Sequence, residues 1–561
     1  MLYLLFGFLL LCQASNGAFF PQEIEIPLIL GLGIGALAVS RLWKQPVTTE
    51  PLKWVLLIML WLCISTITSP VITTSLIATK RYLLYGVIFI AGLTLQTKEK
   101  RGILLLFLSL AVGNSFIACL QEAFHSTHIL GLKGWQAACV PGRYNGLFYN
   151  PNYLGGLAVA AEGVLITWFL IKKTPTCKWK LGTLLISLAL LSEAIIASKS
   201  REACLWSLGA LVLAGIIGFS RHLPKAALLA GFLLILQGLS FFAHRDLVKH
   251  TEDLGQTTLT IKSPTQPGTG ENTRITIWQG SVALWEKSPL TGIHPQMLDT
   301  RWPEVDQSNI YPFMSHNLVL QILCDLGLIG AFLFLAFGIS WCKNVKLNLS
   351  SMDSTTLLSG VGGLLLVSHD LLDYSMYSIF FGGLAVLLLA SGLTTRTAVL
   401  RVKLYTVTGT TSILLLVAAL LMTENIANYY LGKPGKSFKE RSHYVALACK
   451  WNPYTAAFQT ETAVVAAKTG DTSGLGHALL KAYQLDPYDP EITFRLACFL
   501  SDHNKKAISE SLITQMLEKS PNNKQILNRC IQYYTYTGDT NQSASLQQRL
   551  NNQHTTTGFS F

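Results

Sequence analysis

Long apolar runs occupy most of the first three quarters of the chain, and polar positions gather in the short segments between them. A helix needs about 20 apolar residues to cross the hydrocarbon layer of a membrane. Roughly thirteen runs of suitable length are present, and they are centred on residues 4–20, 25–42, 53–69, 80–95, 103–120, 152–171, 181–198, 203–219, 226–242, 317–341, 356–369, 376–393 and 402–422. The pattern predicts an all-α, polytopic membrane protein of about 13 transmembrane helices.

The pattern changes near residue 423, after which the chain is more polar and amphipathic helical stretches recur. Three dipeptides follow one another at a spacing of 34 residues: Asn452-Pro453, Asp486-Pro487 and Ser520-Pro521. A 34-residue period with proline near the unit boundary is typical of tetratricopeptide repeats, whose helix pairs bury a shared face by stacking. We therefore expect a transmembrane core over residues 1–423 and an α-solenoid of tetratricopeptide-like repeats over 424–561. A plain helical bundle is the alternative for the second domain.

Composition agrees with a membrane location and excludes several classes of protein. Half of the 561 residues are hydrophobic and only 13% are charged, about half the charged fraction of a soluble protein. No stripe of basic and aromatic residues indicates a nucleic-acid partner. The 11 cysteines occur singly, without a CxxC pair, which fits neither a zinc site nor a dense disulfide framework. We expect no metal and no other cofactor.

The surplus of 43 − 31 = 12 positive charges predicts the topology. Seventeen basic residues lie in six short loops at 41–53, 98–101, 172–180, 221–225, 343–346 and 396–403. The positive-inside rule places these loops and the N-terminus in the cytoplasm. The first run is expected to remain as a span, because it lacks the basic start of a signal peptide. The segments at 121–151, 199–202, 243–316 and 370–375, and everything after 423, then lie on the opposite side.

The candidate residues for chemistry lie on this outer side, because the chain has no GxxxxGK[ST], HExxH or GxSxG motif. His316-Asn317 opens one span, and Gly327-Leu328-Ile329-Gly330 follows after nine residues. An imidazole at the water interface can take a proton from a hydroxyl. A satisfied helix cap is the alternative role. Gly327 and Gly330 are expected to share one helix face and let a neighbouring helix approach closely.

Two arginines on the same side are suited to bind phosphate, because a guanidinium donates two parallel hydrogen bonds and keeps its charge. Arg201 stands between two spans, where it can also simply reach the headgroups or be neutralised by Glu202. Arg274 stands at the start of a stretch with helical period. In that stretch Ile277, Ser281 and Leu284 fall on one side, which predicts an amphipathic helix near the membrane surface.

A polar segment, Gly142-Arg143-Tyr144-Asn145-Gly146-Leu147-Phe148-Tyr149-Asn150-Pro151-Asn152, leads into another span. Asn152 is expected to cap that helix, with Pro151 directly before it. Two cations and a base at the edge of a membrane are what transfer from a lipid-linked pyrophosphate needs. The arginines stabilise the leaving diphosphate, and the histidine activates the attacking hydroxyl.

On these residues the sequence resembles the O-antigen ligase superfamily, which includes O-antigen ligases, O-antigen polymerases and pilin-type O-oligosaccharyltransferases. The resemblance covers about residues 50–395 and rests on four elements: Gly146–Asn152, Ser200-Arg201, Arg274-x-x-x-Trp278 and the pattern His316-Asn317-x9-Gly327-x-x-Gly330. One departure follows Ser288-Pro289-Leu290, where the family often has Gly-x-Gly and this chain has Gly292-Ile293-His294.

The resemblance implies a metal-independent C-type glycosyltransferase of the bacterial inner membrane that uses an undecaprenyl-diphosphate-linked glycan and inverts the anomeric centre. It implies that His316 is the base and that Arg201 and Arg274 bind the diphosphate, on the periplasmic side. The implied substrate-binding residues are Arg143, Asn150, Asn152, Asn317, Asp370 and Tyr374. The acceptor stays open between lipid A core, a protein and the growing glycan, and the repeats are expected to bind a protein partner.

Three other interpretations remain. A metal-dependent oligosaccharyltransferase would use an acidic pair in the first outer loop, where Glu23 and Glu25 stand. A transporter or flippase would need acidic residues in mid-span, and only Glu162 and Glu193 qualify. A non-catalytic membrane anchor for the repeats would leave the outer arginines and histidine without a role.

Overall fold

The computed structural model describes residues 1–15, 21–42, 49–124, 143–148, 150–172, 177–218, 271–305, 312–348, 352–394, 419, 422–424, 426–433 and 437–555. The predicted span at 226–242, most of that at 402–422 and the first part of the long loop lie outside these ranges. So do several of the basic loop residues: Lys44, Lys173, Arg221, Lys225, Arg396, Arg401 and Lys403. Every regular element in the described ranges is a helix, which confirms the all-α prediction.

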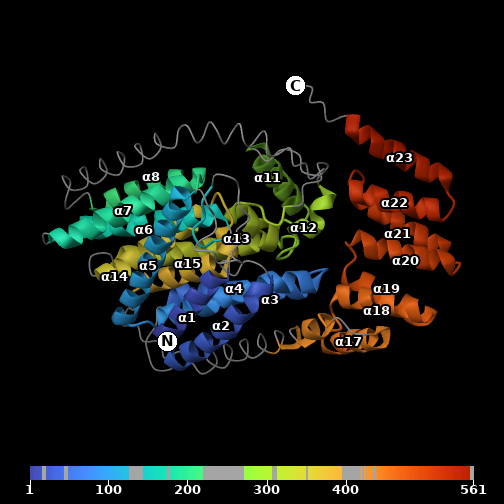
Figure 1. Cartoon of the computed structure of the whole chain (residues 1–561), viewed down its shortest axis with the longest axis horizontal. Helices are drawn as coiled ribbons and strands as arrows, with labels where there is room; N and C mark the ends of the chain where they lie inside the picture. The colour runs from blue at the N-terminus through green and yellow to red at the C-terminus, as the bar shows by residue number, and fades with distance from the viewer. Residues whose placement is uncertain are drawn as a thin grey trace.

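The first part of the chain folds into a bundle of helices (Figure 1). Its helices are α1 Leu2–Ala14, α2 Pro21–Leu42, α3 Thr49–Ile67, α4 Ile72–Leu93, α5 Thr97–Ala123, α6 Pro151–Ile171, α7 Lys178–Ala197, α8 Arg201–Gly218, α11 Glu271–Glu286, α12 Leu298–Arg301, η1 Trp302–Glu304, α13 Leu318–Asn348, α14 Ser354–His369, η2 Ser375–Tyr377 and α15 Ile379–Ser391. Glu23 and Glu25 fall within α2.

Six of the described helices are long and apolar enough to cross a membrane: Glu50–Ile67, Ile72–Leu93, Thr97–Ala123, Pro151–Ile171, Lys178–Ala197 and Leu318–Val345. Four shorter apolar helices accompany them: Leu2–Ala14, Ile26–Leu42, Ser354–His369 and Ile379–Ser391. The chain is therefore a multi-pass membrane protein, while the total of about thirteen spans stays a prediction. One boundary was wrong, because α4 begins at Ile72 and not near residue 80, which places Lys80 and Arg81 inside the helix.

Helix α6 lies at the centre of the bundle and packs against α5, α7, α8 and α14. Small residues on α6 let two of these neighbours approach closely. A Cβ added at Gly155 would come within 2.7 Å of the Ala203 Cβ on α8, and one at Gly156 would come within 3.0 Å of the His369 ring on α14. This packing fixes the ends of α8 and α14 beside the start of α6.

The last part of the chain forms a stack of short helices beside the bundle (Figure 1). They are α17 Phe438–Trp451, α18 Ala456–Thr469, α19 Thr472–Leu485, α20 Pro490–Asp502, α21 Lys506–Lys519, α22 Lys524–Tyr536 and α23 Thr540–Thr555. Consecutive helices pack against one another along the stack. Asn452, Asp486 and Ser520 are the C-caps of α17, α19 and α21, so the prolines that follow them do mark helix ends, as predicted.

Candidate functional site

The segment before α6 is held in place by buried polar side chains of α5. Asn114 and Gln121 accept hydrogen bonds from the backbone amides of Leu147 and Gly146, at 3.1 and 2.9 Å. Gly146 has a φ of +60°, a conformation that glycine adopts without strain. The Arg143 Nε donates to the Ser198 carbonyl at 2.7 Å. The arginine is thereby fixed where α7 ends and α8 is about to begin.

The predicted cap of α6 was wrong by two residues. Asn150 is the N-cap, and its side chain accepts from the Asn152 amide at 2.9 Å. Pro151 occupies the first helical position, where proline is favoured because its missing amide hydrogen would have no partner there. The side chain of Asn152 accepts a hydrogen bond from Arg143. The side-chain amide of Asn150 donates to the Tyr374 hydroxyl at 3.3 Å.

Arg274 lies in the first turn of α11 and forms an ion pair with Glu202 in the first turn of α8. Its guanidinium also donates to the Leu372 carbonyl at 3.1 Å. The other Glu202 oxygen accepts from the Ser200 hydroxyl at 3.0 Å. Glu202 thus joins Arg274 in α11 to the start of α8.

The predicted helix around Arg274 is confirmed, and so is its buried side. Ile277, Ser281 and Leu284 are all buried on α11. Arg201 is the first residue of α8 and its side chain is exposed. Of the two predicted phosphate-binding arginines, Arg274 is thus partly buried in the cluster and Arg201 is exposed at the start of α8.

His316 stands two residues before α13, with a φ of +51°. Its ring meets the Tyr374 ring edge-on, with centroids 4.4 Å apart, and its Nδ1 lies 3.8 Å from the Asp373 carboxylate. The side chain of His316 is 27% exposed, whereas that of Asp373 is fully buried. Asn317 has a local role, because its side chain accepts from the Leu320 amide at 3.0 Å and caps α13.

The loop from 370 to 377 joins α14 to α15 and carries the carboxylates of the site. Burial raises the pKa of the Asp370 carboxyl, which accepts hydrogen bonds from the Ser375 hydroxyl and the Met376 amide. Its backbone carbonyl accepts from the Leu318 amide at 2.9 Å and so fixes the start of α13. Burial opposes ionisation of Asp373 as well, but His316, His369 and Arg274 around it hold the pKa of that carboxyl below its usual range.

The cluster is thus a mixed set of charges in electrostatic contact. Burial lowers the pKa of Arg143, while the nearby Glu202 and Asp373 oppose this shift and Arg274 adds to it. Within the described ranges, the structure brings together Arg143, Asn150, Asn152, Glu202, Arg274, His316, Asp373 and Tyr374. They include an imidazole facing a carboxylate and guanidinium groups suited to an anionic ligand.

The sequence analysis missed Arg81 and its partner Tyr377, which support this loop. Arg81 in α4 is completely buried, and its guanidinium carbon lies 3.3 Å from the centre of the Tyr377 ring. The Tyr377 hydroxyl donates to the Gln296 side chain, and the Tyr85 hydroxyl donates to the Met376 carbonyl at 2.8 Å. The signal available in the sequence was the pair Lys80-Arg81 within an apolar run, because a charge inside a span usually has a specific role.

The prediction that Gly327 and Gly330 share a helix face was wrong. Gly327 interrupts α13 with φ +64° and ψ −164°, which is not helical. The element that approaches it is the backbone of the preceding loop, since the Leu328 amide donates to the Pro289 carbonyl at 2.9 Å and the Ile293 amide to the Cys324 carbonyl at 2.6 Å. The glycine at position 327 therefore lets the preceding loop pack directly against the broken helix.

The departure at His294 is accommodated in this loop. Gly292 and His294 have positive φ values of +73° and +75°. A histidine is strained in this conformation, but its Nδ1 lies 2.8 Å from the Ser65 carbonyl, to which it can donate. Burial lowers the pKa of His294, and Arg301 adds to this effect.

Residues 186–335 match the family model described as O-antigen ligase. No curated protein matches the chain. The matched region contains Arg201, Glu202, Arg274 and His316, together with the broken helix at Gly327. Proteins of this family act in membranes on lipid-linked glycans. The chain therefore carries, over residues 186–335, the domain of the O-antigen ligase family.

Proposed function

We propose that the protein transfers a glycan from an undecaprenyl-diphosphate-linked donor to an acceptor hydroxyl at the periplasmic face of the bacterial inner membrane. The observation that carries this proposal is that Arg274, His316 and the loop at 370–374 lie together. Arg274 and His316 belong to the matched family domain, and this family acts on lipid-linked glycans. The acceptor is lipid A core or a protein. The same chemistry on a lipid-linked glycan as acceptor would make the protein a polymerase.

In this reaction the His316 imidazole accepts the proton of the acceptor hydroxyl as its oxygen attacks the anomeric carbon. The bond from that carbon to the diphosphate breaks, and the diphosphate leaves with the electron pair, so the configuration is inverted. Asp373, 3.8 Å from His316, stabilises the imidazolium that forms, as a buried carboxylate does in a catalytic triad.

Arg201 and Arg274 stabilise the charge that develops on the leaving diphosphate. Arg274 is held by Glu202 in this structure, so a diphosphate must compete with that carboxylate or bind the guanidinium beside it. Arg143, Asn150, Asn152 and Tyr374 form the adjoining wall for the donor. Asn317 and Asp370 contribute by fixing the start of α13 and the loop.

The proposal includes a topology. The loops rich in lysine and arginine are cytoplasmic, about thirteen helices span the membrane, and the long loop and residues 424–561 are periplasmic. The stack from α17 to α23 is a tetratricopeptide-like solenoid, which the period of 34 residues and the paired packing of its helices support. A transport function has less support, because the buried Glu162 accepts hydrogen bonds from Ser192 and Ser207 at 2.9 and 2.6 Å.

The test is transfer by purified protein in lipid nanodiscs that are supplied with lipid-linked donor and acceptor. We expect His316→Ala to lower the rate by about 100-fold or more, as loss of a general base does, and chelator to have no effect. Lys98→Ala, an exposed change at the start of α5 outside the cluster, is the control. Full activity in His316→Ala would remove this residue as the base, and inhibition by chelator would favour a metal-dependent mechanism.

A further inference from the structure

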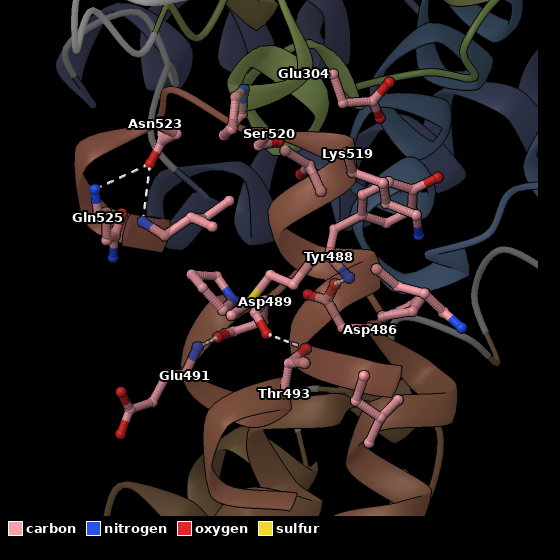
Figure 2. A pocket seen from close by; sticks show the side chains of 18 of the residues that line it. Glu304, Asp486, Tyr488, Asp489, Glu491, Thr493, Lys519, Ser520, Asn523 and Gln525 are labelled. Carbon is pink, nitrogen blue, oxygen red and sulfur yellow. Dashed lines mark hydrogen bonds between the residues drawn. The ribbon is translucent and has the colours of Figure 1, made fainter. Parts of the chain in front are cut away.

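A groove of about 360 Å³ lies where the helix stack meets α12 and η1 of the membrane domain. One wall comes from α12 and η1 and includes Asp299, Thr300 and Glu304. The other wall comes from the turn between α19 and α20, the end of α21 and the start of α22. Figure 2 shows Glu304, which belongs to the first wall, above the side chains contributed by the stack.

The contact between the two parts is specific. The Tyr488 ring packs against the apolar cluster that includes Leu284 and Trp302. The Arg301 guanidinium lies 5.9 Å from the centre of that ring, and the Lys519 ammonium lies 5.0 Å from it. Arg301 is in turn fixed by two hydrogen bonds of 2.7 and 2.9 Å to Glu304. The groove therefore has walls that are held in place before any ligand binds.

The groove is too large to be a packing defect. Liquid water occupies about 30 Å³ per molecule, and voids much larger than one water are rare in well-packed proteins. Its volume falls instead within the range of ligand sites, about 300 to 1,000 Å³. Both walls also offer groups that can form hydrogen bonds, so the space has the character of a binding site.

The groups in the walls match the surface of a sugar. Carboxylates accept hydrogen bonds from hydroxyl groups, and the amides of Gln515 and Gln525 and the ammonium of Lys519 donate them. Tyr483 and Met516 provide apolar area for the C–H faces of a sugar ring. A sugar hydroxyl both donates and accepts, which suits this mixture better than it suits an apolar ligand.

The charges favour a neutral or amino sugar over an acidic one. The lining contains five carboxylates, those of Asp299, Glu304, Asp486, Asp489 and Glu491, and one lysine. Glu304 and Glu491 have arginine partners outside the groove, but Asp299, Asp486 and Asp489 accept hydrogen bonds from backbone amides of their own turns. Burial raises the pKa of Asp486 to about 6, and the neighbouring Asp489 and Asp299 add to this effect.

We propose that this groove binds sugar units of the glycan chain that the donor carries, some distance along the chain from its diphosphate. This inference rests on the proposed function. Helix α11 begins at the cluster with Arg274 and packs against η1 and α12, which form one wall of the groove, so this helix connects the cluster to the groove. Binding there would hold long chains and would leave donors with a single sugar unaffected.

A polypeptide fits the groove less well. Strand addition requires a sheet edge, and the described ranges contain only helices, turns and irregular segments. A bound amphipathic helix requires a continuous apolar groove, whereas carboxylates, hydroxyls and amides alternate with the apolar side chains of this lining.

The test uses the full-length protein in nanodiscs and two donors of the same lipid, one with a single sugar and one with a chain of several repeat units. Gln515→Trp places a large side chain in the groove from an exposed helix position. Glu518→Trp is the control, because it introduces the same tryptophan at an exposed position of α21 outside the lining. We expect Gln515→Trp to raise KM for the long donor about tenfold, with kcat and the KM for the short donor unchanged within about twofold.

A second readout needs no transfer. The soluble long glycan, released from its lipid by mild acid, is titrated into wild-type protein in a calorimeter, and we expect binding that Gln515→Trp weakens about tenfold. Equal KM values for both donors in wild type, no effect of Gln515→Trp, or an increase only in the KM for the acceptor would overturn the inference. Glycan binding by a protein that transfers nothing would instead overturn the proposed function and leave the groove assigned.

Discussion

A buried charge in a membrane-spanning helix needs a fixed partner, and Arg81 has one in Tyr377. A guanidinium over an aromatic face is stabilised by about 2 kcal/mol when both groups are shielded from water. The Tyr377 hydroxyl continues the contact to Gln296 in the long loop. Arg81 therefore supports, from inside the bundle, the loop whose Asp373 faces His316.

A pair of substitutions at Tyr377 separates these two contacts. Tyr377→Phe keeps the ring and loses the hydrogen bond, so we expect a loss of about 1 kcal/mol. Tyr377→Leu also removes the face on which Arg81 rests, and we expect a loss of about 3 kcal/mol. Thermal unfolding of the purified protein in detergent measures both. Equal melting temperatures for the two variants would show that the ring does not stabilise the arginine.

The paired charges of the cluster were only partly predictable, because their partners come from distant segments. Residue type and position identified Arg274 and His316, whereas Glu202 was expected only as a partner of Arg201. The pairing of Glu202 with Arg274 spans 72 positions in the chain, and nothing local specifies it. The interaction of His316 with Asp373 depends likewise on how α13 and α14 pack.

At the scale of elements, the break in α13 at Gly327 fixes the loop that precedes it. The amide of Leu328, freed by the break, donates to the Pro289 carbonyl, and the loop reaches the helix backbone without intervening side chains. The Cβ of any other residue at Gly327 would overlap the Leu290 carbonyl. The positive φ adds a further cost of about 1 to 2 kcal/mol for an L-residue.

Gly327→Ala should therefore destabilise the protein by about 2 kcal/mol or more and lower transfer activity. Gly338→Ala on the same helix is the control, because a Cβ there meets nothing within 4 Å and alanine favours the helix by about 1 kcal/mol. Melting temperature and transfer rate are measured for both variants. A Gly327→Ala protein as stable and active as Gly338→Ala would contradict the role assigned to the break.

The elements that were predicted well are those with a repeated signal. Apolar length predicted the helices, and proline at three evenly spaced positions predicted where α17, α19 and α21 end. Single residues were less informative. Asn150 and Asn152 are both good caps by type, and only the place of Pro151 decides between them, while a glycine such as Gly327 permits a helix and a break equally.

At the scale of the whole molecule, the stack and the membrane domain bring acidic side chains near one another where they meet. Burial is the main reason that the pKa of Asp486 in the stack is raised to about 6. The negative charge of Asp299 in α12 also contributes to this rise. A carboxyl whose pKa is raised on folding stabilises the fold most when it is protonated. The contribution of Asp486 to stability is then highest below about pH 4. It falls as the pH rises towards 6 and is constant above that pH.

Asp486→Asn should remove this penalty at neutral pH. The amide oxygen can still accept from the Tyr488 amide, so the turn is retained. We expect stabilisation of up to about 3 kcal/mol at pH 7, from a shift of about two units, and no difference from wild type at pH 4. Melting temperatures of the full protein between pH 4 and 8 provide the measurement. A variant that is destabilised at pH 7 would contradict the assigned electrostatic cost.

The way the stack is attached has a consequence for how such a chain can vary over evolution. The groove uses residues from α19 to α22, and α23 continues the stack beyond them by packing on α22. Because each helix pair rests on its neighbour, pairs gained or lost after α23 would leave the attachment to the membrane domain undisturbed. The C-terminal end is thus free to change in length and to acquire new contacts at little cost to this attachment, whereas an insertion between α19 and α22 would separate the side chains that form the stack's wall of the groove.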